Sequence, residues 1–528
     1  MSRIGHRHFN DIRQALLARQ ELALVDVREE APFAEAHPLF AVNIPLSRLE
    51  IEVYARIPRR DTAITVYDNG EGLAELAARR LLSLGYSNVA LLEGLLQGWQ
   101  QAGGELFKDV NVPSKAFGEL VESQRHTPSL AAEEVKALLD SKADVVVLDA
   151  RRFDEYQTMS IPGGISVPGA ELVLRARALA PDPQTRIIVN CAGRTRSIIG
   201  TQSLVNAGIP NPVSALRNGT IGWTLAGFSL EHGQQQQFSG VSPEQQQWAQ
   251  QQARNIADQA GVGRVTPEIL EVWQAESGRT TYLFDVRTEQ EYQSGHLPDA
   301  RWVAGGQLVQ ETDHYASVRG ARIVLFDDRQ VRADMSASWL AQMGWEVYVL
   351  DAVKPQLLSA TGNWQAVVAA SPPVEEISAQ TLAQWLQQGH TRLLDVTGSA
   401  SYVKQHIPGA YWVLRSRLQQ VLAGIPAAER YVVTCGSSLL ARYVVAEVQQ
   451  WLPGKPVFLL AQGTTGWINA GLPLEQGETA LASPRNDRYR RPYEGTDNPA
   501  EAMQGYLDWE FGLVEQLRRD GTHGFKVI

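Results

Sequence analysis

One pattern occurs four times along the 528 residues, and this repetition limits what the chain can fold into. Each copy contains an apolar segment that ends in aspartate, then a turn with proline, then a second apolar segment. The first segments end at Asp26, Asp149, Asp285 and Asp395. The second segments end at Asp68, Cys191, Asp327 and Cys435. The period of about 110 to 135 residues is too long for a solenoid, and it predicts four tandem domains.

Each copy alternates short apolar segments with helical patterns, which predicts an α/β fold. The segment Ile187–Val189 is β-branched and typical of a strand, and the helix after it is predicted to end at Gly208. This alternation favours a mainly parallel sheet flanked by helices in each domain. Ligands of open parallel sheets bind at the carboxyl ends of strands, so the residue that ends the second segment is the candidate site position in every copy.

The repeats predict six segments along the chain. The domains are expected at residues 1–115, 120–232, 263–370 and 374–480. Residues 233–262 are rich in glutamine and are predicted to form a linker helix, with a disordered spacer as the alternative. Residues 481–528 are predicted to form a tail that contains one helix. Asp497 or Asn498 is expected to cap this helix, which runs to about Arg519 and packs onto a domain.

Composition excludes several classes of function. The net charge of −10 argues against general affinity for nucleic acid. No apolar run has the length of a membrane span, and the first residues lack the apolar core of a signal peptide, so we expect a cytoplasmic location and no membrane partner. Two cysteines far apart in the chain exclude a disulfide framework and a thiolate metal cluster, and we expect neither metal nor cofactor.

The stretch Arg186–Gly208 contains the strongest candidate for chemistry. A strand leads into Cys191, two arginines follow at Arg194 and Arg196, and a helix is predicted to start near Ser197. A tight loop between a strand and a helix presents backbone N–H groups to an anion. Helix N-termini and arginines lower thiol pKa values, so we predict that Cys191 is a thiolate nucleophile.

The motifs of the second copy resemble those of the rhodanese sulfurtransferases. The sequence Asp-Ala-Arg-x₃-Glu-Tyr at residues 149–156, the turn IPGG, the loop CAGRTRS and a late Gly-Trp pair occur in the order typical of that family. The resemblance extends over nearly the whole chain as four copies. It implies a parallel sheet with helices on both faces and a cysteine loop curled around backbone amides. We interpret Arg151 as structural, at a spacing that suits an ion pair with Glu155.

The resemblance implies a thiosulfate sulfurtransferase that works in two steps. The Cys191 thiolate attacks the outer sulfur of thiosulfate or a similar anionic donor, sulfite leaves, and a persulfide forms. Arg194 and Arg196 are expected to attract the donor. The loop that would bind the terminal sulfur consists of Ala192, Gly193, Arg194, Thr195 and Arg196. A thiol or cyanide then accepts the sulfur, and a sulfur-carrier protein is a further candidate partner.

Two alternatives remain at this point. The related phosphatases have a loop that is one residue longer, with arginine six positions after cysteine, whereas Arg196 is five positions after Cys191; a phosphatase is therefore the less favoured alternative. The other alternative is a sulfur-relay or scaffold protein that a protein partner loads, because several copies lack the complete cysteine loop.

The remaining copies depart from the pattern at the nucleophile or around it. Asp68 and Asp327 cannot carry a sulfane sulfur, so domains 1 and 3 are predicted to be inactive. Cys435 begins the loop CGSSLLA, which lacks arginine and is similar to the uncharged loop of mercaptopyruvate sulfurtransferases. Leucines fill two positions of this loop. We predict that Cys435 is a vestigial or auxiliary thiol, with a second catalyst as the open alternative.

Overall fold

A computed structural model describes residues 2–528 and contains four five-stranded sheets, one for each repeat. All strand pairs within these sheets are parallel, and helices flank each sheet. The central strands, such as β4 (Ile64–Tyr67) and β14 (Arg322–Phe326), are buried along their whole length. Near-continuous apolar strands are typical of parallel sheets that are covered on both faces. The predicted α/β fold class is confirmed.

Domain 1 has the strand order β1-β5-β4-β2-β3. Its other strands are β1 (Gly5–Arg7), β2 (Ala23–Asp26), β3 (Ala41–Asn43) and β5 (Val89–Leu92). Its helices are α1 (Phe9–Leu17), α2 (Glu30–Glu35), η1 (Leu46–Arg48), α3 (Leu49–Arg56), α4 (Ala74–Ser83) and α5 (Leu95–Gln101). Helix α6 (Val112–Arg125) leads from this domain to the next.

Domain 2 has the order β6-β10-β9-β7-β8. Its strands are β6 (Ser129–Leu130), β7 (Val145–Asp149), β8 (Ile165–Ser166), β9 (Arg186–Asn190) and β10 (Val213–Leu216). Its helices are α7 (Ala132–Asp140), α8 (Phe153–Thr158), η2 (Gly169–Glu171), α9 (Leu172–Leu179), α10 (Thr195–Asn206) and α11 (Gly219–Leu225).

Domain 3 has the order β11-β15-β14-β12-β13. Its other strands are β11 (Gly263–Val265), β12 (Thr281–Asp285), β13 (Arg301–Trp302) and β15 (Glu346–Leu350). Its helices are α13 (Pro267–Ala275), α14 (Glu289–Ser294), α15 (Gly305–Gln310), α16 (Thr312–Tyr315), α17 (Arg332–Gln342) and η3 (Pro355–Leu357).

Domain 4 has the order β16-β20-β19-β17-β18. Its strands are β16 (Glu376–Ile377), β17 (Thr391–Asp395), β18 (Ala410–Trp412), β19 (Arg430–Thr434) and β20 (Val457–Leu460). Its helices are α18 (Ala379–Gln388), α19 (Ser399–Lys404), η4 (Arg415–Arg417), α20 (Leu418–Gly424), α21 (Ala441–Trp451) and α22 (Gly463–Asn469).

The glutamine-rich segment contains the helix α12 (Pro243–Gln259). The Ser242 hydroxyl accepts a hydrogen bond from the Gln245 backbone N–H, and the Gln245 side chain accepts one from the Ser242 N–H. This reciprocal cap stabilises the start of the helix. Its apolar face packs against α9 of domain 2 and α17 of domain 3, so the helix is part of the contact between these domains.

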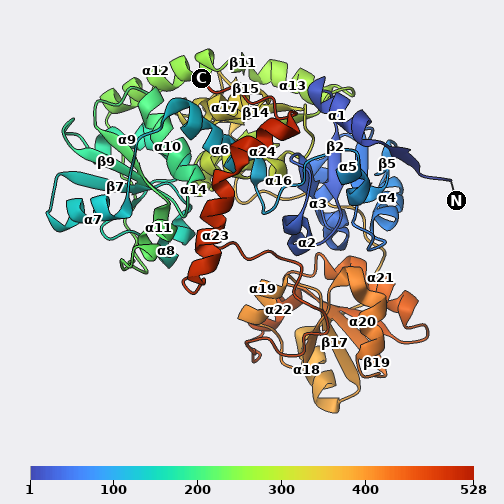
Figure 1. Cartoon of the computed structure of the whole chain (residues 1–528). Helices are drawn as coiled ribbons and strands as arrows, with labels where there is room; N and C mark the ends of the chain where they lie inside the picture. Colours follow the sequence, from blue (N-terminus) through green and yellow to red (C-terminus); the bar gives the residue numbers. More distant parts are fainter. Residues whose placement is uncertain (1) are drawn as a thin grey trace.

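The tail forms two helices, α23 (Ala500–Phe511) and α24 (Leu513–Asp520). The expected single helix is interrupted at Gly512, because glycine has a low helix propensity. The N-cap position of α23 is occupied by Pro499 and not by Asp497 or Asn498 as expected. In Figure 1 these red helices cross the middle of the molecule between domains 1 and 2, and α24 packs on α6. The tail therefore contacts segments that lie hundreds of residues earlier in the chain.

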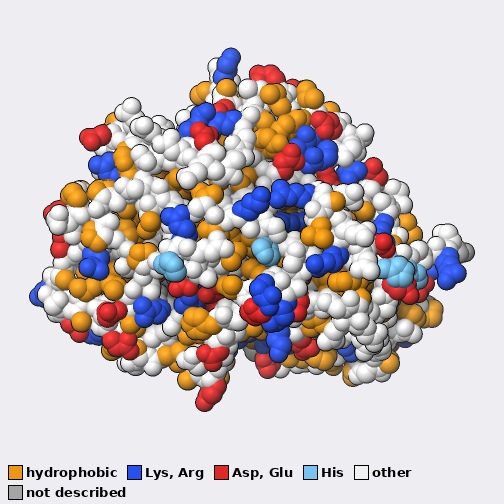
Figure 2. Space-filling model, turned by 45° about the horizontal axis from the view of Figure 1, so that its top comes forward, with side chains coloured by type: hydrophobic (Ala, Val, Ile, Leu, Met, Phe, Trp, Pro, Cys, Tyr) orange, Lys and Arg blue, Asp and Glu red, His pale blue; other side chains and the backbone are white. Residues whose placement is uncertain are grey.

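Domains 1 and 3 share one hydrophobic core with α6 and α24, whereas domain 4 has cores of its own. Domain 4 lies below domain 1 in the view of Figure 1. Basic and acidic side chains are interspersed over the face that Figure 2 shows. Within residues 2–528, no helix has both the length and the apolar character needed to span a membrane.

Candidate active site

Cys191 directly follows β9, a central strand of domain 2, and its loop leads into α10. The start of α11 fixes this loop from the other side: the N–H groups of Thr220 and Ile221 donate to the carbonyl oxygens of Cys191 and Ala192, both at 3.0 Å. Gly219 has a φ of 59°, and a β-carbon there would lie 2.2 Å from the Cys191 carbonyl oxygen. Only glycine fits at this contact.

The Cys191 thiol is closed off from solvent, with 2% of the residue exposed. It donates to the Ser197 hydroxyl at 3.3 Å, and that hydroxyl donates to the Arg194 carbonyl oxygen at 2.9 Å. Burial raises the pKa of Cys191, and the charge of Glu510 adds to this rise, while Arg196 and Ser197 oppose it. The expected lowering of this pKa is therefore wrong, because the loss of water around the thiol outweighs the charge of Arg196 and the hydrogen bonds with Ser197.

Both loop arginines are bound to carboxylates within the protein. Arg194 forms a two-pronged ion pair with Glu119 of α6, at 2.6 and 3.0 Å, and its guanidinium stacks 4.4 Å from the Phe511 ring centre. Arg196 pairs in the same way with Glu155 of α8, at 2.7 and 3.0 Å. The pair holds the pKa of Glu155 down at about 2. The sequence singled out both arginines but not these partners, which are far away in the chain.

The Arg196–Glu155 pair corrects the expectation for Arg151. Arg151 binds Asp149 instead, with 2.7 Å between Nη2 and Oδ2, and donates to the Met159 carbonyl oxygen at 2.5 Å. The same fork recurs at Asp26–Arg28 and Asp285–Arg287. Because the arginine lies only two residues after the aspartate that ends the strand, the fork closes the first loop of each of these domains.

The C-terminal helix α23 covers the Cys191 loop. A β-carbon placed on Gly193 would lie 3.1 Å from the Tyr506 ring and 3.2 Å from Oε1 of Glu510. The Thr195 hydroxyl donates to Oε2 of Glu510 at 3.4 Å. Sequence reasoning missed these two tail residues as part of the site; the aromatic spacing of the tail indicated packing but not against which domain.

In the equivalent loops of domains 1 and 3, an aspartate side chain is the anion that the loop amides bind. The Asp68 carboxylate accepts from the backbone N–H groups of Gly70, Leu73 and Ala74, at 2.7 to 2.8 Å. The Asp327 carboxylate accepts from three backbone N–H groups of its loop. These belong to Val331, Arg332 and Ala333, at 3.4, 3.3 and 3.2 Å. In both domains the loop amides therefore point at the side chain of the position that Cys191 occupies in domain 2.

The Cys435 loop shares backbone contacts with the Cys191 loop but is more exposed to solvent. Sγ of Cys435 accepts from the Ala441 N–H at 3.4 Å, and Gly463 approaches the Cys435 carbonyl as Gly219 approaches that of Cys191. Burial raises the pKa of Cys435, whereas the N–H groups of its loop act in the opposite direction. Cys435 is buried, but Gly436 and Ser437 beside it are exposed, unlike the buried residues around Cys191.

Two polar cavities lie where domain 2 meets the tail, and domain 3 also lines the first of them. One, of about 310 Å³, is lined by Glu155 and Arg196, and the other, of about 390 Å³, is lined by Thr220 and Ile221. Both also contact Tyr493 of the tail. The first cavity reaches the Cys191 loop at Arg196, and the second reaches the residues of α11 that bind the carbonyl oxygens of the loop.

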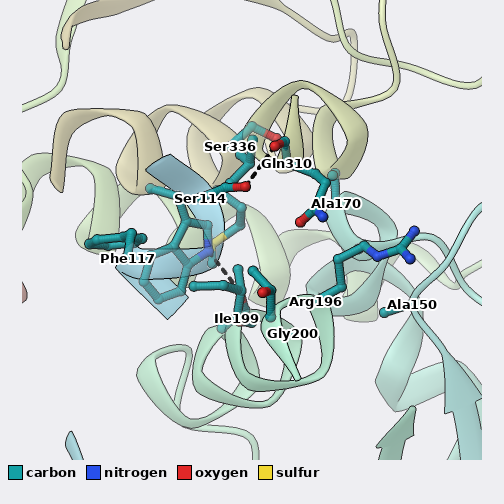
Figure 3. A pocket seen from close by; sticks show the side chains of 16 residues that line it. Ser114, Phe117, Ala150, Ala170, Arg196, Ile199, Gly200, Gln310 and Ser336 are labelled. Atoms are coloured by element: carbon teal, nitrogen blue, oxygen red, sulfur yellow. Dashed lines mark hydrogen bonds between the residues drawn. The ribbon is translucent and has the colours of Figure 1, made fainter. Parts of the chain in front are cut away.

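A third cavity, of about 40 Å³, lies where domain 2 meets domain 3. Figure 3 shows its walls, with Arg196 and Gly200 on one side and Ser336 on the other. Two hydrogen bonds cross it: Ser114 donates to the Gln310 carbonyl oxygen at 2.6 Å, and the Trp339 indole donates to Ser203 at 2.9 Å. This cavity is lined mostly by packing residues and is part of the domain contact.

Comparison with known proteins agrees with this architecture. A family model of the rhodanese-like domain matches residues 10–102, 131–226, 266–352 and 378–470. The crystal structure of a thiosulfate sulfurtransferase from Pseudomonas aeruginosa is 70% identical in sequence, covers 99% of this chain and 100% of that chain, and superimposes with a TM-score of 0.98.

Two curated proteins match parts of the chain. A thiosulfate sulfurtransferase of Azotobacter vinelandii is 27% identical over 207 residues, which are 35% of this chain and 74% of that protein. An uncharacterized protein of Synechocystis is 35% identical over 101 residues, 19% of this chain, and the match spans 55% of that relative's length. With four matches to one family model and the same four sheets in the structure, the chain belongs to the family of rhodanese-like domain proteins.

Proposed function

We propose that this protein is a thiosulfate sulfurtransferase that carries sulfane sulfur as a persulfide on Cys191. One observation carries the proposal: in the sister loops of domains 1 and 3, the loop amides bind a carboxylate at the position that Cys191 holds in domain 2. A loop whose backbone N–H groups bind an anion at this position can bind the anion of a cysteine persulfide in the same way. The close likeness to the thiosulfate sulfurtransferase of Pseudomonas aeruginosa supports the same activity.

The reaction consists of two displacements on sulfur. Once a movement of the tail admits solvent, the Cys191 thiol gives its proton to water, and the thiolate attacks the outer sulfur of thiosulfate; the S–S bond of the donor breaks and its electron pair leaves with sulfite. The persulfide is bound by the N–H groups of the loop Ala192–Arg196 and of Ser197. A thiolate or cyanide then attacks the terminal sulfur, and the Cys191 thiolate leaves.

The two arginines have different roles in this proposal. Arg196 favours the negative charge on the Cys191 sulfur, and it does so from a position fixed by Glu155. Arg194 is bound to Glu119 and to the Phe511 ring, so it holds the loop against α6 and the tail. Thr195, which bonds to Glu510, connects the loop to α23.

Access to Cys191 requires a movement on the tail side, because the thiol is buried under α23. The two cavities that Tyr493 lines offer the donor and the acceptor an approach toward the loop. A sulfur-carrier protein is a candidate acceptor, as it would present a thiol there. Both cysteines are free, and we propose the cytoplasm as the compartment that keeps such thiols reduced.

Turnover of thiosulfate with cyanide tests the function. We expect Cys191→Ala to reduce kcat/KM at least about 10³-fold, since it removes the nucleophile, and Cys435→Ala to change it less than about twofold. Full activity of Cys191→Ala would contradict the proposal, and hydrolysis of an aryl phosphate would favour the phosphatase alternative.

A further inference from the structure

The carboxyl group of Glu510 has one oxygen that the protein does not use. The residue is fully buried, and Oε1 has no hydrogen-bond partner within residues 2–528, while Oε2 accepts from Thr195. Oε1 faces the loop at Gly193, two residues after Cys191. A buried polar atom without a partner is rare and costly, and in a site that must admit a ligand it marks a place where the ligand is contacted.

The other charges around the loop are already neutralised in pairs. Three ion pairs involve the nearby cations: Arg194–Glu119, Arg196–Glu155 and Lys115–Asp109. Among residues 2–528, no cation lies within ion-pair distance of Glu510. A donor that reaches Cys191 therefore meets arginines and a lysine that are already paired, and a carboxyl group that has no cation partner among the described residues.

We propose that Glu510, which lies outside all four repeats, is a specificity-determining residue of the Cys191 site that, when ionised, makes it favour sulfane donors of low charge, such as a thiosulfonate monoanion, over the thiosulfate dianion. The inference rests on the proposed function of Cys191. The attack is the same for both donors: the Cys191 thiolate takes the outer sulfur, the S–S bond breaks, and its electron pair leaves with a sulfinate or with sulfite.

The packing of α23 makes this carboxyl group a fixed part of the site. Lys115 is fully buried, lies 5.2 Å from the ring centres of Tyr493 and Tyr506 and 5.9 Å from that of Trp509, and anchors the helix. Because α23 is anchored beside it, we place the movement that admits the donor in the tail segment around Tyr493, before α23, and Glu510 stays at the loop.

Discrimination by Glu510 is expected to depend on pH. Burial and the neighbouring Glu119 raise the pKa of Glu510 to about 8, against the effects of Lys115 and Arg194. Below that pH the neutral carboxyl group donates a hydrogen bond to an oxygen of the donor, and above it the carboxylate repels the donor in proportion to its charge. The charged and titratable groups that face Glu510 are Lys115, Glu119, Asp109, Arg194, Tyr506 and Cys191.

The test compares two donors on the full-length protein, thiosulfate and benzenethiosulfonate, with cyanide as the acceptor. The ionisation of Cys191 affects both donors equally, so its effect cancels in the ratio of their kcat/KM values. In the wild type we expect the ratio of thiosulfate to benzenethiosulfonate to fall about tenfold from about pH 7 to about pH 9.5, the effect of one extra unit charge on the donor. In Glu510→Gln the ratio is expected to be independent of pH.

The matched control is Glu501→Gln, which changes an exposed glutamate on the same helix and should follow the wild type. A pH-independent ratio in the wild type, or a Glu510→Gln ratio that falls as the wild type does, would overturn the proposal. The pH dependence of the donor ratio in the wild type tests the proposal even if the Glu510→Gln variant does not fold. Cys191→Ser separates the two proposals: if it still turns over both donors, the Cys191 function itself fails.

Discussion

The Cys191 loop of domain 2 and the Asp327 loop of domain 3 have nearly the same frame but different contents. They follow the equivalent strands β9 and β14, and in each the arginine at the fifth position pairs with a glutamate 41 residues earlier, Arg196 with Glu155 and Arg332 with Glu291. The Asp327 carboxylate accepts hydrogen bonds from the amides of its own loop. In domain 2 the thiol instead donates to a hydroxyl.

This difference shows how one residue separates a reactive loop from a structural one. Asp327 supplies the anion that the loop binds, so that loop has no room for another. The arginine of this loop then serves the domain contact, because Arg332 also binds Glu171 of domain 2 at 2.9 Å. Cys191 leaves the amides of its loop available for a sulfur atom that arrives with the substrate.

The largest expected effect comes from making domain 2 like domain 3. Cys191→Asp should abolish thiosulfate turnover, by at least about 10³-fold, because a carboxylate cannot carry sulfane sulfur. The fold should persist, since the loop amides donate hydrogen bonds to a carboxylate in domains 1 and 3. Steady-state rates measure the loss of activity, and circular dichroism measures whether the fold persists. An active Cys191→Asp protein would show that the aspartate does not make such a loop inactive.

The arginines of the two loops should differ in their effect on stability. Arg332 is fully buried with four carboxylates around it, whereas Arg196 pairs with one carboxylate within the described residues and its side chain is 12% exposed. Arg332→Ala is expected to lower the free energy of unfolding by about 4 kcal/mol, and Arg196→Ala by about 2 kcal/mol. Denaturation midpoints give the order. Equal losses would mean that the extra carboxylates of domain 3 contribute nothing.

The glutamates of the two pairs should make the protein sensitive to acid. The pKa values of Glu155 and Glu291 are both lowered, to about 2, and in each case the paired arginine opposes the effect of burial. A lowered carboxyl pKa stabilises the fold above the unfolded pKa of about 4.3, and this stability is lost as the pH falls toward about 2. We expect about 2 kcal/mol from each pair, after a discount for partial exposure. Glu155→Gln and Glu291→Gln should each flatten the stability profile between about pH 4.5 and about pH 2.

The smallest effect concerns the sixth position of the loop, where domain 2 has Ser197 and domain 3 has Ala333. Ser197 opposes the rise in the pKa of Cys191. Ser197→Ala should therefore reduce kcat/KM near neutral pH about two- to fivefold and move the rising limb of the pH profile to higher pH. The matched change Ala333→Ser should leave activity unaltered. An unchanged profile for Ser197→Ala would assign this serine to packing alone.

Much of the fold was predictable from the sequence, because it depends on local patterns that recur. The strands that end at Asp149 and at the residue before Cys191 lie where their apolar runs indicated, and the four-domain α/β architecture follows from the same signals. The partners of the site were not predictable. Arg194 binds a glutamate 75 residues earlier, and Thr195 binds one 315 residues later.

Two errors have the same physical origin. The rise in the pKa of Cys191 depends on how completely α23 and the neighbouring elements exclude water, which no local pattern records. The expected Arg151–Glu155 pair was plausible from spacing, yet Glu155 binds an arginine from another loop. Burial and long-range pairing are properties of the assembled domains.

The mass of the intact protein after incubation with thiosulfate, measured without reductant, shows directly whether Cys191 carries sulfane sulfur. We expect one added sulfur atom on the wild type and on Cys435→Ser, located by peptide mapping on Cys191, and none on Cys191→Ser. Sulfur that still adds to Cys191→Ser, or a wild type that gains none, would contradict the assignment of Cys191 as the sulfur carrier.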